Sequence, residues 1–206
     1  MDPSVALVQA YLHVNGYFTV AEYPVLEALR RARARSVTDL DMLAFRFPQA
    51  AHDVVRGRGH GPLGVTPDPV LGAPVDRPDM IVGEIKEGAA RFNPATRDPA
   101  VLEIALARFG CCSAEEMEPV VRSLLSRGRA ETPAGHVVRM VAFGAAPEAA
   151  DPQRWTTVPM AHVVGFLRGY LEQHWDVLRH AQLREQGLSM LALLEKCRAS
   201  RGARGG

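Results

Sequence analysis

Lysine is almost absent from this sequence. The chain has 24 lysine and arginine residues, but only Lys86 and Lys196 are lysines, so arginine supplies nearly all of the positive charge. A compact ammonium group can approach a phosphate or a water closely and can change its pKa on burial, which a planar guanidinium does not do. A lysine that lies beside an acidic residue in such a sequence is therefore a candidate for a specific chemical role.

The sequence also has few cysteines, no long apolar run and a small net charge. The three cysteines, of which Cys111 and Cys112 are adjacent, do not make a disulfide framework, and this favours a reducing cytoplasm. No apolar run is long enough to span a bilayer, and Met1-Asp2-Pro3 lacks the positive start of a secretory signal. We therefore expect a cytoplasmic protein with no membrane partner. A net charge of +1 neither requires nor excludes nucleic acid, so a basic surface would have to come from local clustering of arginines.

Two short apolar segments carry charged residues at alternate positions. Thr38–Ala44 and Ile81–Lys86 contain β-branched or bulky apolar residues, which predicts two strands that enter a core. Side chains alternate across a strand, so Asp39 and Asp41 share one face of the first strand. By the same rule, the Glu-x-Lys sequence at 84–86 places its carboxylate and its ammonium on one face of the second strand.

Asp41, Glu84 and Lys86 converge if the two strands are neighbours. Charges in otherwise apolar strands are usually paired or hold a metal ion. Two carboxylates beside one ammonium can hold a divalent ion next to an activated water, which indicates hydrolytic chemistry. The alternative is a Glu-x-Lys sequence that faces solvent on an edge strand.

An acidic residue in one strand followed by Glu-x-Lys in the next resembles the PD-(D/E)XK nuclease superfamily, which includes restriction endonucleases and Holliday junction resolvases. Leu40-Asp41 stands where the pattern has Pro-Asp, and Glu84-Ile85-Lys86 matches its second half. The long interval between the two halves requires an inserted loop. Resolvase-like members often have an acidic residue on the first helix, where this chain offers Gln9.

The resemblance implies a metal-dependent nuclease that hydrolyses phosphodiester bonds, with DNA as the favoured substrate. Asp41 and Glu84 would bind Mg²⁺ or Mn²⁺, and Lys86 would orient the attacking water or stabilise charge on the scissile phosphate. These three residues would be the catalytic ones, and Asp39 would be a weaker candidate metal ligand. A homodimer is compatible with this interpretation.

The order of the predicted elements agrees with the same resemblance. Apolar periodicity, caps and turn residues predict a helix, three strands, two helices, a strand and a long helix. The predicted ranges are Val5–His13, Tyr17–Leu26, Thr38–Ala44, Ile81–Lys86, Asp98–Phe109, Ser113–Ser126, His136–Phe143 and Val158–Leu183. This is a mixed α/β fold similar to the restriction endonuclease-like α-β-β-β-α-β core, with one inserted helix and a long C-terminal helix.

The length of the chain fits one domain, and the resemblance implies that residues 1–197 form a single nuclease-like domain. Residues 48–78 are rich in proline and glycine, which predicts a flexible insertion within the domain. Residues 198–206 are rich in glycine and arginine, which predicts a disordered tail.

The densest positive charge lies between the first two predicted strands, at Arg30, Arg31, Arg33 and Arg35. A run of this kind can neutralise phosphates without reading base sequence, so these residues are candidate contacts to a nucleic-acid backbone. The alternative is a solvated turn that makes no such contact.

Residues 98–143 have a second interpretation. Two helices, a Pro133-Ala134-Gly135 turn and a strand resemble a winged helix, in which Arg122, Arg127 and Arg129 would meet a DNA backbone. The alternative is that these elements simply cover the sheet of the nuclease-like fold. If the segment is a winged helix, the protein is a non-catalytic nucleic-acid-binding or regulatory protein. A protein with a nuclease fold that no longer cuts belongs to the same functional class.

Overall fold

The structure is a computed structural model, and it describes residues 2–29, 33–50, 67–145 and 154–202. The elements are α1 (Pro3–Val14), β1 (Phe18–Leu29), β2 (Arg33–Arg46), β3 (Asp79–Ala89), the 3-10 helix η1 (Ala95–Arg97), α2 (Pro99–Phe109), α3 (Ala114–Arg127), β4 (Arg129–Glu131), β5 (Val137–Ala145), β6 (Thr156–Pro159), α4 (Met160–Gln173), α5 (Trp175–Leu178) and α6 (Gln186–Gly202). Within these ranges, every helix is too short or too polar to cross a membrane.

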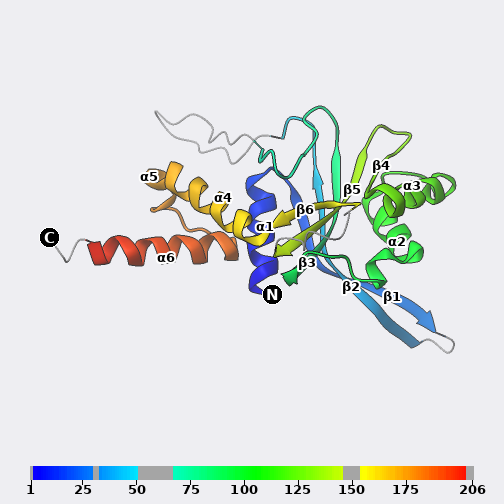
Figure 1. Cartoon of the computed structure of the whole chain (residues 1–206), viewed down its shortest axis with the longest axis horizontal. Helices are drawn as coiled ribbons and strands as arrows, with labels where there is room; N and C mark the ends of the chain where they lie inside the picture. The colour runs from blue at the N-terminus through cyan, green and yellow to red at the C-terminus, as the bar shows by residue number, and fades with distance from the viewer. Residues whose placement is uncertain (1, 30–32, 51–66, 146–153, 203–206) are drawn as a thin grey trace.

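The strands form one mixed sheet. The order is β1-β2-β3-β5-β4, and β6 pairs with β5 (Figure 1). β1, β2 and β3 form an antiparallel meander, and β5 pairs with β3 in parallel. The parallel pairing is possible because α2 and α3 carry the chain back across one face of the sheet before β5 begins. The predicted mixed α/β class is confirmed.

Helices cover both faces of the sheet. Ile81, Ile85 and Val141 belong to the core under α1, α4 and α6, whereas Val82 and Met140 belong to the core under α2 and α3. The inner strands are therefore buried on both sides, which accounts for their nearly continuous apolar sequences.

The segment 98–143 contains the helices, the turn and the strands of a winged helix, but β5 is an inner strand of the main sheet. Leu102 and Leu106 of α2, and Val121 and Leu124 of α3, are buried in the core of this sheet. The segment therefore covers the sheet, as its alternative interpretation has it.

Local sequence sets the starts of three helices. Asp2 caps α1 and Asp98 caps α2, each with its carboxylate accepting backbone N–H groups of the first turn. Ser113 and Glu116 form the predicted capping box at the start of α3. These short-range signals explain why the predicted helix starts at 98 and 113 agree with the structure.

β1 and β2 form a long hairpin whose end projects away from the body of the protein (Figure 1). Its pairing shifts register between Val25 and Leu26, and Glu22 has a positive φ of 52°. Pro24 lacks an N–H for the ladder, and it is tolerated because β1 is an edge strand.

A buried ion pair joins β3 to β5. Arg139 of β5 binds Asp79 of β3 through two hydrogen bonds, Nε to Oδ1 at 2.8 Å and Nη2 to Oδ2 at 2.6 Å. The hydroxyl of Tyr17 donates to the same carboxylate at 2.5 Å, and Arg139 Nη1 donates to the carbonyl of Leu71 at 2.6 Å. A buried ion pair is tolerated when its remaining donors and acceptors are satisfied in this way.

The 48–78 insertion is held against the body at its C-terminal end. Leu71 is fully buried, and Asp68 accepts a hydrogen bond from the hydroxyl of Tyr11 at 2.6 Å. The prediction of a flexible insertion is therefore wrong for this end, because its sequence hides one buried leucine and one buried carboxylate among the turn residues. The part from 51 to 66 lies outside the described residues.

The two ends of the insertion also contact each other. The N–H of Gln49 donates to the carbonyl of Val75 at 3.1 Å. The buried guanidinium of Arg46 donates to the carbonyls of Pro74 (3.0 Å) and Ala50 (3.4 Å), one on each side of the insertion. The chain therefore leaves the sheet and returns to it at one place.

The predicted single helix over 158–183 is wrong. β6 occupies its start, and the remainder is divided into α4 and α5. The division falls at His174, whose φ of −113° and ψ of 18° depart from helical values. No proline or glycine marks this position, so turn chemistry alone does not predict it.

The last helix, α6, extends through Gly202 and so passes the predicted start of a disordered tail at 198. Leu188, Leu191 and Ala192 recur at helical spacing and are buried in the core beside α1 and α4. Apolar burial thus anchors the first half of α6. Residues 203–206 lie outside the described residues.

Gly83 lies where β2 and β3 pack closely against each other. A Cβ at this position would lie 3.0 Å from Met42 Cβ and 3.4 Å from the Met42 carbonyl oxygen. We expect Gly83→Ala to lower the free energy of unfolding by about 1–3 kcal/mol, as overpacking does, in urea denaturation. Gly88→Ala in the same strand is the matched control, because nothing lies within 4 Å of a Cβ there. Equal losses in the two variants would contradict this account.

Candidate active site

β2 and β3 part where their charged residues begin. The described pairing of the two strands ends at Met42 opposite Gly83, although each strand continues beyond this point. The next residue of β2 is Asp41, and its carboxylate Oδ2 accepts a hydrogen bond from the backbone N–H of Ile85 at 2.8 Å. A side chain thus satisfies a backbone donor that the ladder leaves unpaired.

Asp41, Glu84 and Lys86 come together here, and we call them the β2–β3 site. Lys86 Nζ lies 2.5 Å from Glu84 Oε1 and 4.0 Å from Asp41 Oδ2. Thr96 of η1 donates to the other oxygen of Glu84, Oε2, at 2.6 Å. The Glu84 side chain is 3% exposed, whereas those of Asp41 and Lys86 are 27% and 36% exposed. The site therefore has a buried floor at Glu84 and opens to solvent at the other two residues.

The charge of Asp41 is only partly compensated. Burial raises the pKa of its carboxyl above the ordinary value, and the negative charges of Glu84 and Asp2 raise it further. The hydrogen bond from Ile85 and the ammonium of Lys86 lower the pKa without cancelling the rise. A bound cation would favour the ionised form of Asp41.

These residues fit a hard divalent cation. Mg²⁺ is usually bound through one or two carboxylates while keeping several waters, and Asp41 and Glu84 supply two. Both carboxylates already face one positive charge, the ammonium of Lys86. In the described parts of the chain, no group of three or more His, Cys, Asp or Glu side chains is arranged to hold a metal. An ion at this site would therefore complete its coordination with water or substrate.

The structure does not bring Asp39 to the β2–β3 site. Asp39 is exposed in the hairpin, opposite Pro24 of β1, and no described contact joins it to the other charged residues. Gln9 of α1 donates to the hydroxyl of Thr19 at 3.0 Å rather than to the site.

The arginine run also lies apart from the site. Arg35 pairs with Glu27 at 2.7 Å, and both side chains are exposed. It is six residues from Asp41 along β2, on the order of 20 Å at the usual rise of a strand. The other residues of the run lie outside the described residues, either wholly or by their side chains: Arg30, Arg31 and Arg33.

Sequence reasoning missed two groups at the site. Thr96 is buried and bonds Glu84, but it lies in an irregular segment with no periodic signal. Asp2 is close enough to raise the pKa of Asp41, and its sequence signal is the cap that it supplies to α1.

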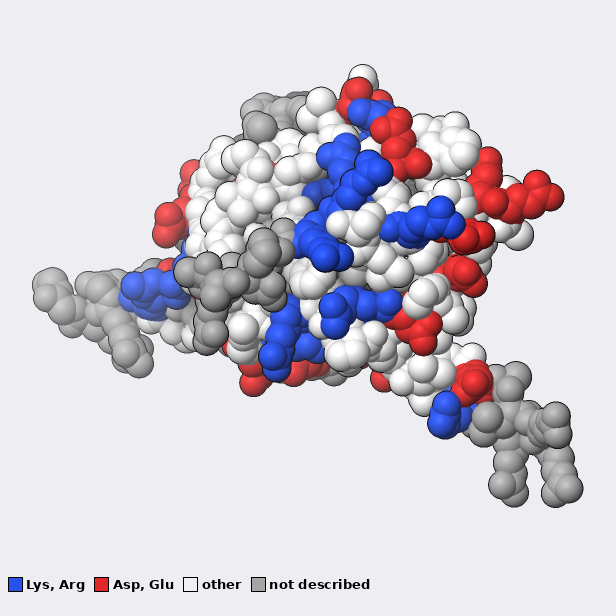
Figure 2. Space-filling model, turned by 45° about the vertical axis from the view of Figure 1, so that its right-hand side comes forward, with Lys and Arg blue, Asp and Glu red and all other residues white. Residues whose placement is uncertain are grey.

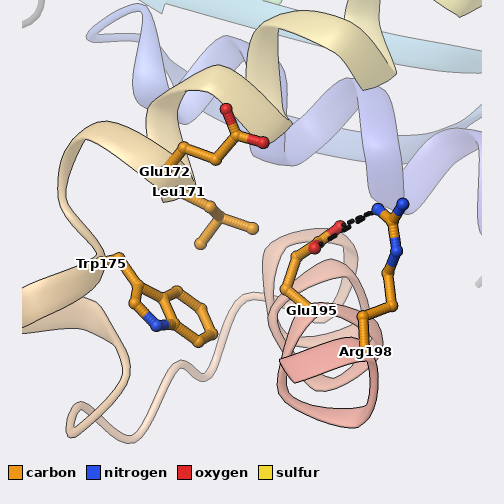
Figure 3. A pocket seen from close by; sticks show the side chains of 5 residues that line it. All are labelled: Leu171, Glu172, Trp175, Glu195 and Arg198. Carbon is orange, nitrogen blue, oxygen red and sulfur yellow. Dashed lines mark hydrogen bonds and ion pairs between the residues drawn. The ribbon is translucent and has the colours of Figure 1, made fainter. Parts of the chain in front are cut away.

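A cavity of about 420 Å³ lies between α4, α5 and α6, and Figure 3 shows its lining. It is lined by Leu171, Glu172, Trp175, Glu195 and Arg198. Arg198 pairs with Glu195 one turn earlier on α6, at 3.3 Å. These helices pack on the α1 side of the sheet, whereas Glu84 bonds η1 before α2, so the cavity is separate from the β2–β3 site.

No family model, curated protein or solved structure matches the chain. A function therefore has to be proposed from the β2–β3 site and the fold that forms it.

Asp41→Asn should separate the charge of this residue from its hydrogen bond. The amide oxygen can still accept from the N–H of Ile85, but the buried charge is lost. Because the folded-state pKa of Asp41 is raised, ionisation opposes folding above that pKa and has no effect below the unfolded value of about 3.9. We expect a higher Tm for the variant at pH 7 in EDTA, and a difference that shrinks as the pH falls towards 4.

Asp39→Asn is the control, because Asp39 is an exposed aspartate of the same strand. It should leave the Tm unchanged across the same pH range. A lower Tm for Asp41→Asn at pH 7 would mean that the Asp41 carboxylate stabilises the metal-free fold, contrary to the account given above.

Proposed function

We propose that the protein is a metal-dependent nuclease of the PD-(D/E)XK type, with DNA as the favoured substrate. The observation that carries the proposal is the meeting of Asp41 and Glu84 on one ammonium, that of Lys86, where β2 and β3 part. The element order supports it, because a helix and an antiparallel three-stranded meander are followed by helices and a strand parallel to β3.

Asp41 and Glu84 would hold Mg²⁺ or Mn²⁺. When bound, such an ion polarises a phosphoryl oxygen and lowers the pKa of a coordinated water. Thr96 and the N–H of Ile85 each donate to one of the two carboxylates and fix its orientation. For both carboxylates to face the ion, the ammonium of Lys86 has to move away from Glu84. The Lys86 side chain is 36% exposed, so the ammonium can move towards solvent.

Lys86 would then act on the substrate. In hydrolysis, the water oxygen bonds to phosphorus while the bond from phosphorus to the leaving sugar oxygen breaks. The proton released by the water passes to solvent, and the leaving oxygen takes a proton from solvent to become a hydroxyl group. Negative charge builds up on the phosphoryl oxygens in this step. An ammonium held beside them stabilises that charge more than it stabilises the ground state.

The competing function is nucleic-acid binding without cleavage. The observation that favours it is the 2.5 Å contact between Lys86 and Glu84, in which the charge of Glu84 is already neutralised without a metal. Incubation with plasmid and with single-stranded DNA separates the two functions. A nuclease should cut at least one substrate with Mg²⁺ or Mn²⁺ and neither in EDTA, whereas uncut DNA under every condition would leave the binding function.

Lys86→Ala should separate metal binding from catalysis. The substitution frees Glu84 from its ion pair and removes a repelling charge, so Mn²⁺ affinity in titration calorimetry should persist or increase. Cleavage should nonetheless fall on the order of a hundredfold or more, as for the loss of one preorganised charge stabiliser. Lys86→Arg should not restore it, because the planar guanidinium cannot take the place of a compact ammonium.

Two further variants complete the test. Asp41→Asn should lose both Mn²⁺ affinity and cleavage, since it removes a ligand. Lys196→Ala changes the only other lysine, which is exposed on α6, and should leave both unchanged. Cleavage by Lys86→Ala at the parent rate would show that Lys86 is an ordinary strand lysine.

A further inference from the structure

The exposed arginines of the described chain fall into two sets. Several are matched with carboxylates, as in Arg35 with Glu27 at 2.7 Å and Arg122 with Glu118 at 2.5 Å, and Arg179 lies 3.9 Å from Asp176. A second set is exposed and forms no ion pair with any described carboxylate. Four members of this set, which we call the arginine surface, come from three separate segments: Arg91, Arg127, Arg129 and Arg154.

The turn between α3 and β4 lies directly against the start of β6. Gly128 has a φ of +66°, and a Cβ on it would come within 2.2 Å of the carbonyl oxygen of Arg154 and 2.6 Å of Trp155 Cα. Arg127 and Arg129, on either side of this glycine, therefore lie next to Arg154. Only glycine allows the two segments to approach so closely.

An aromatic contact connects this cluster to the segment after β3. The rings of Phe92 and Trp155 meet edge to face, with centroids 5.1 Å apart and planes at 73°. Arg91 precedes Phe92 and Arg154 precedes Trp155, so the contact brings both exposed arginines to one region. In Figure 2, which brings the α2–α3 side of Figure 1 forward, Lys and Arg side chains gather in the middle of the face.

The strand register gives the distance from the β2–β3 site. Glu84 of β3 is level with Ala142 of β5, which is level with Thr157 of β6. Two strand spacings amount to about 10 Å, and Arg154 lies three residues before Thr157, about 10 Å along the chain. The arginine surface therefore begins on the order of 15 Å from Glu84, which is about four nucleotides of a strand at 3.4 Å each.

We propose that the arginine surface binds the sugar–phosphate backbone of a polynucleotide that extends from the β2–β3 site. The proposal rests on the proposed function for the nature of the substrate. Unpaired guanidinium groups spread over such a surface match a chain of phosphates, whereas a single phosphate would need them to converge on one point. The substrate is therefore a polynucleotide at least several residues long.

The experiment measures binding without cleavage. Fluorescently labelled duplexes are titrated with the full chain in EDTA over a range of NaCl concentrations. Replacing the four arginines by alanine should lower the slope of log affinity against log salt by about 0.9 for each lost contact, or about 3 to 4 in total. A triple variant of other paired arginines, Arg168→Ala with Arg179→Ala and Arg198→Ala, is the matched control and should keep the parent slope, because each of these arginines faces a carboxylate of Glu195 or Asp176.

The outcomes separate this proposal from the nuclease proposal. A reduced slope in the fourfold variant supports the arginine surface even if no metal ion induces cleavage, in which case the nuclease proposal fails alone. An unchanged slope in a variant of parental Tm overturns the arginine surface, whether or not the parent cleaves. An equal loss in the control variant overturns it too, because the effect would then be one of net charge. Displacement of the duplex by poly-glutamate at equal charge would overturn it in favour of an acidic protein partner.

Discussion

The separation of β2 from β3 after the Met42–Gly83 pair decides where Asp41, Glu84 and Lys86 meet. Up to that pair the two strands share a ladder and bury apolar side chains. Beyond it the N–H of Ile85 would lack a partner, and the carboxylate of Asp41 takes that role. Just beyond the same pair, Lys86 lies between the carboxylates of Glu84 and Asp41, so the end of the backbone pairing coincides with the cluster of charges.

The β2–β3 site is costly for the fold that contains it. Glu84 is almost fully buried, and its two oxygens are satisfied by Thr96 and by Lys86. Asp41 is held in a place where its charge is disfavoured. The Arg139–Asp79 pair is equally buried, yet its charges match, and four of its donor and acceptor contacts are made within the protein. The contrast shows that the charges of the Arg139–Asp79 pair are matched within the protein, whereas the charge of Asp41 in the β2–β3 site is not.

Local signals carried most of what was predictable from the sequence. The cap at Ser113 predicted the start of a helix, and charge alternation predicted that Glu84 shares a face with its lysine, because both are properties of neighbouring residues. Thr96 could not be assigned to the site, because it lies in an irregular segment whose sequence has no periodic pattern. Its hydrogen bond to Glu84 depends on how that segment packs against β3. The break at His174 and the anchoring of α6 by Leu191 depend on packing against distant helices, which a single sequence does not encode locally.

The insertion between β2 and β3 has both ends rooted at one spot, where Gln49 bonds Val75 and Arg46 holds the carbonyls on either side. Because the ends of this loop are already held together, a change in its length has little effect on the sheet. Each doubling of the length costs only about 0.6 kcal/mol in closure entropy. Only the part of the insertion that precedes Asp68 can therefore change in length at this small cost, because Asp68 and Leu71 are themselves held against the body of the protein. In evolutionary terms, that part is a place where the sequence can diversify while the sheet and its charged residues stay constant.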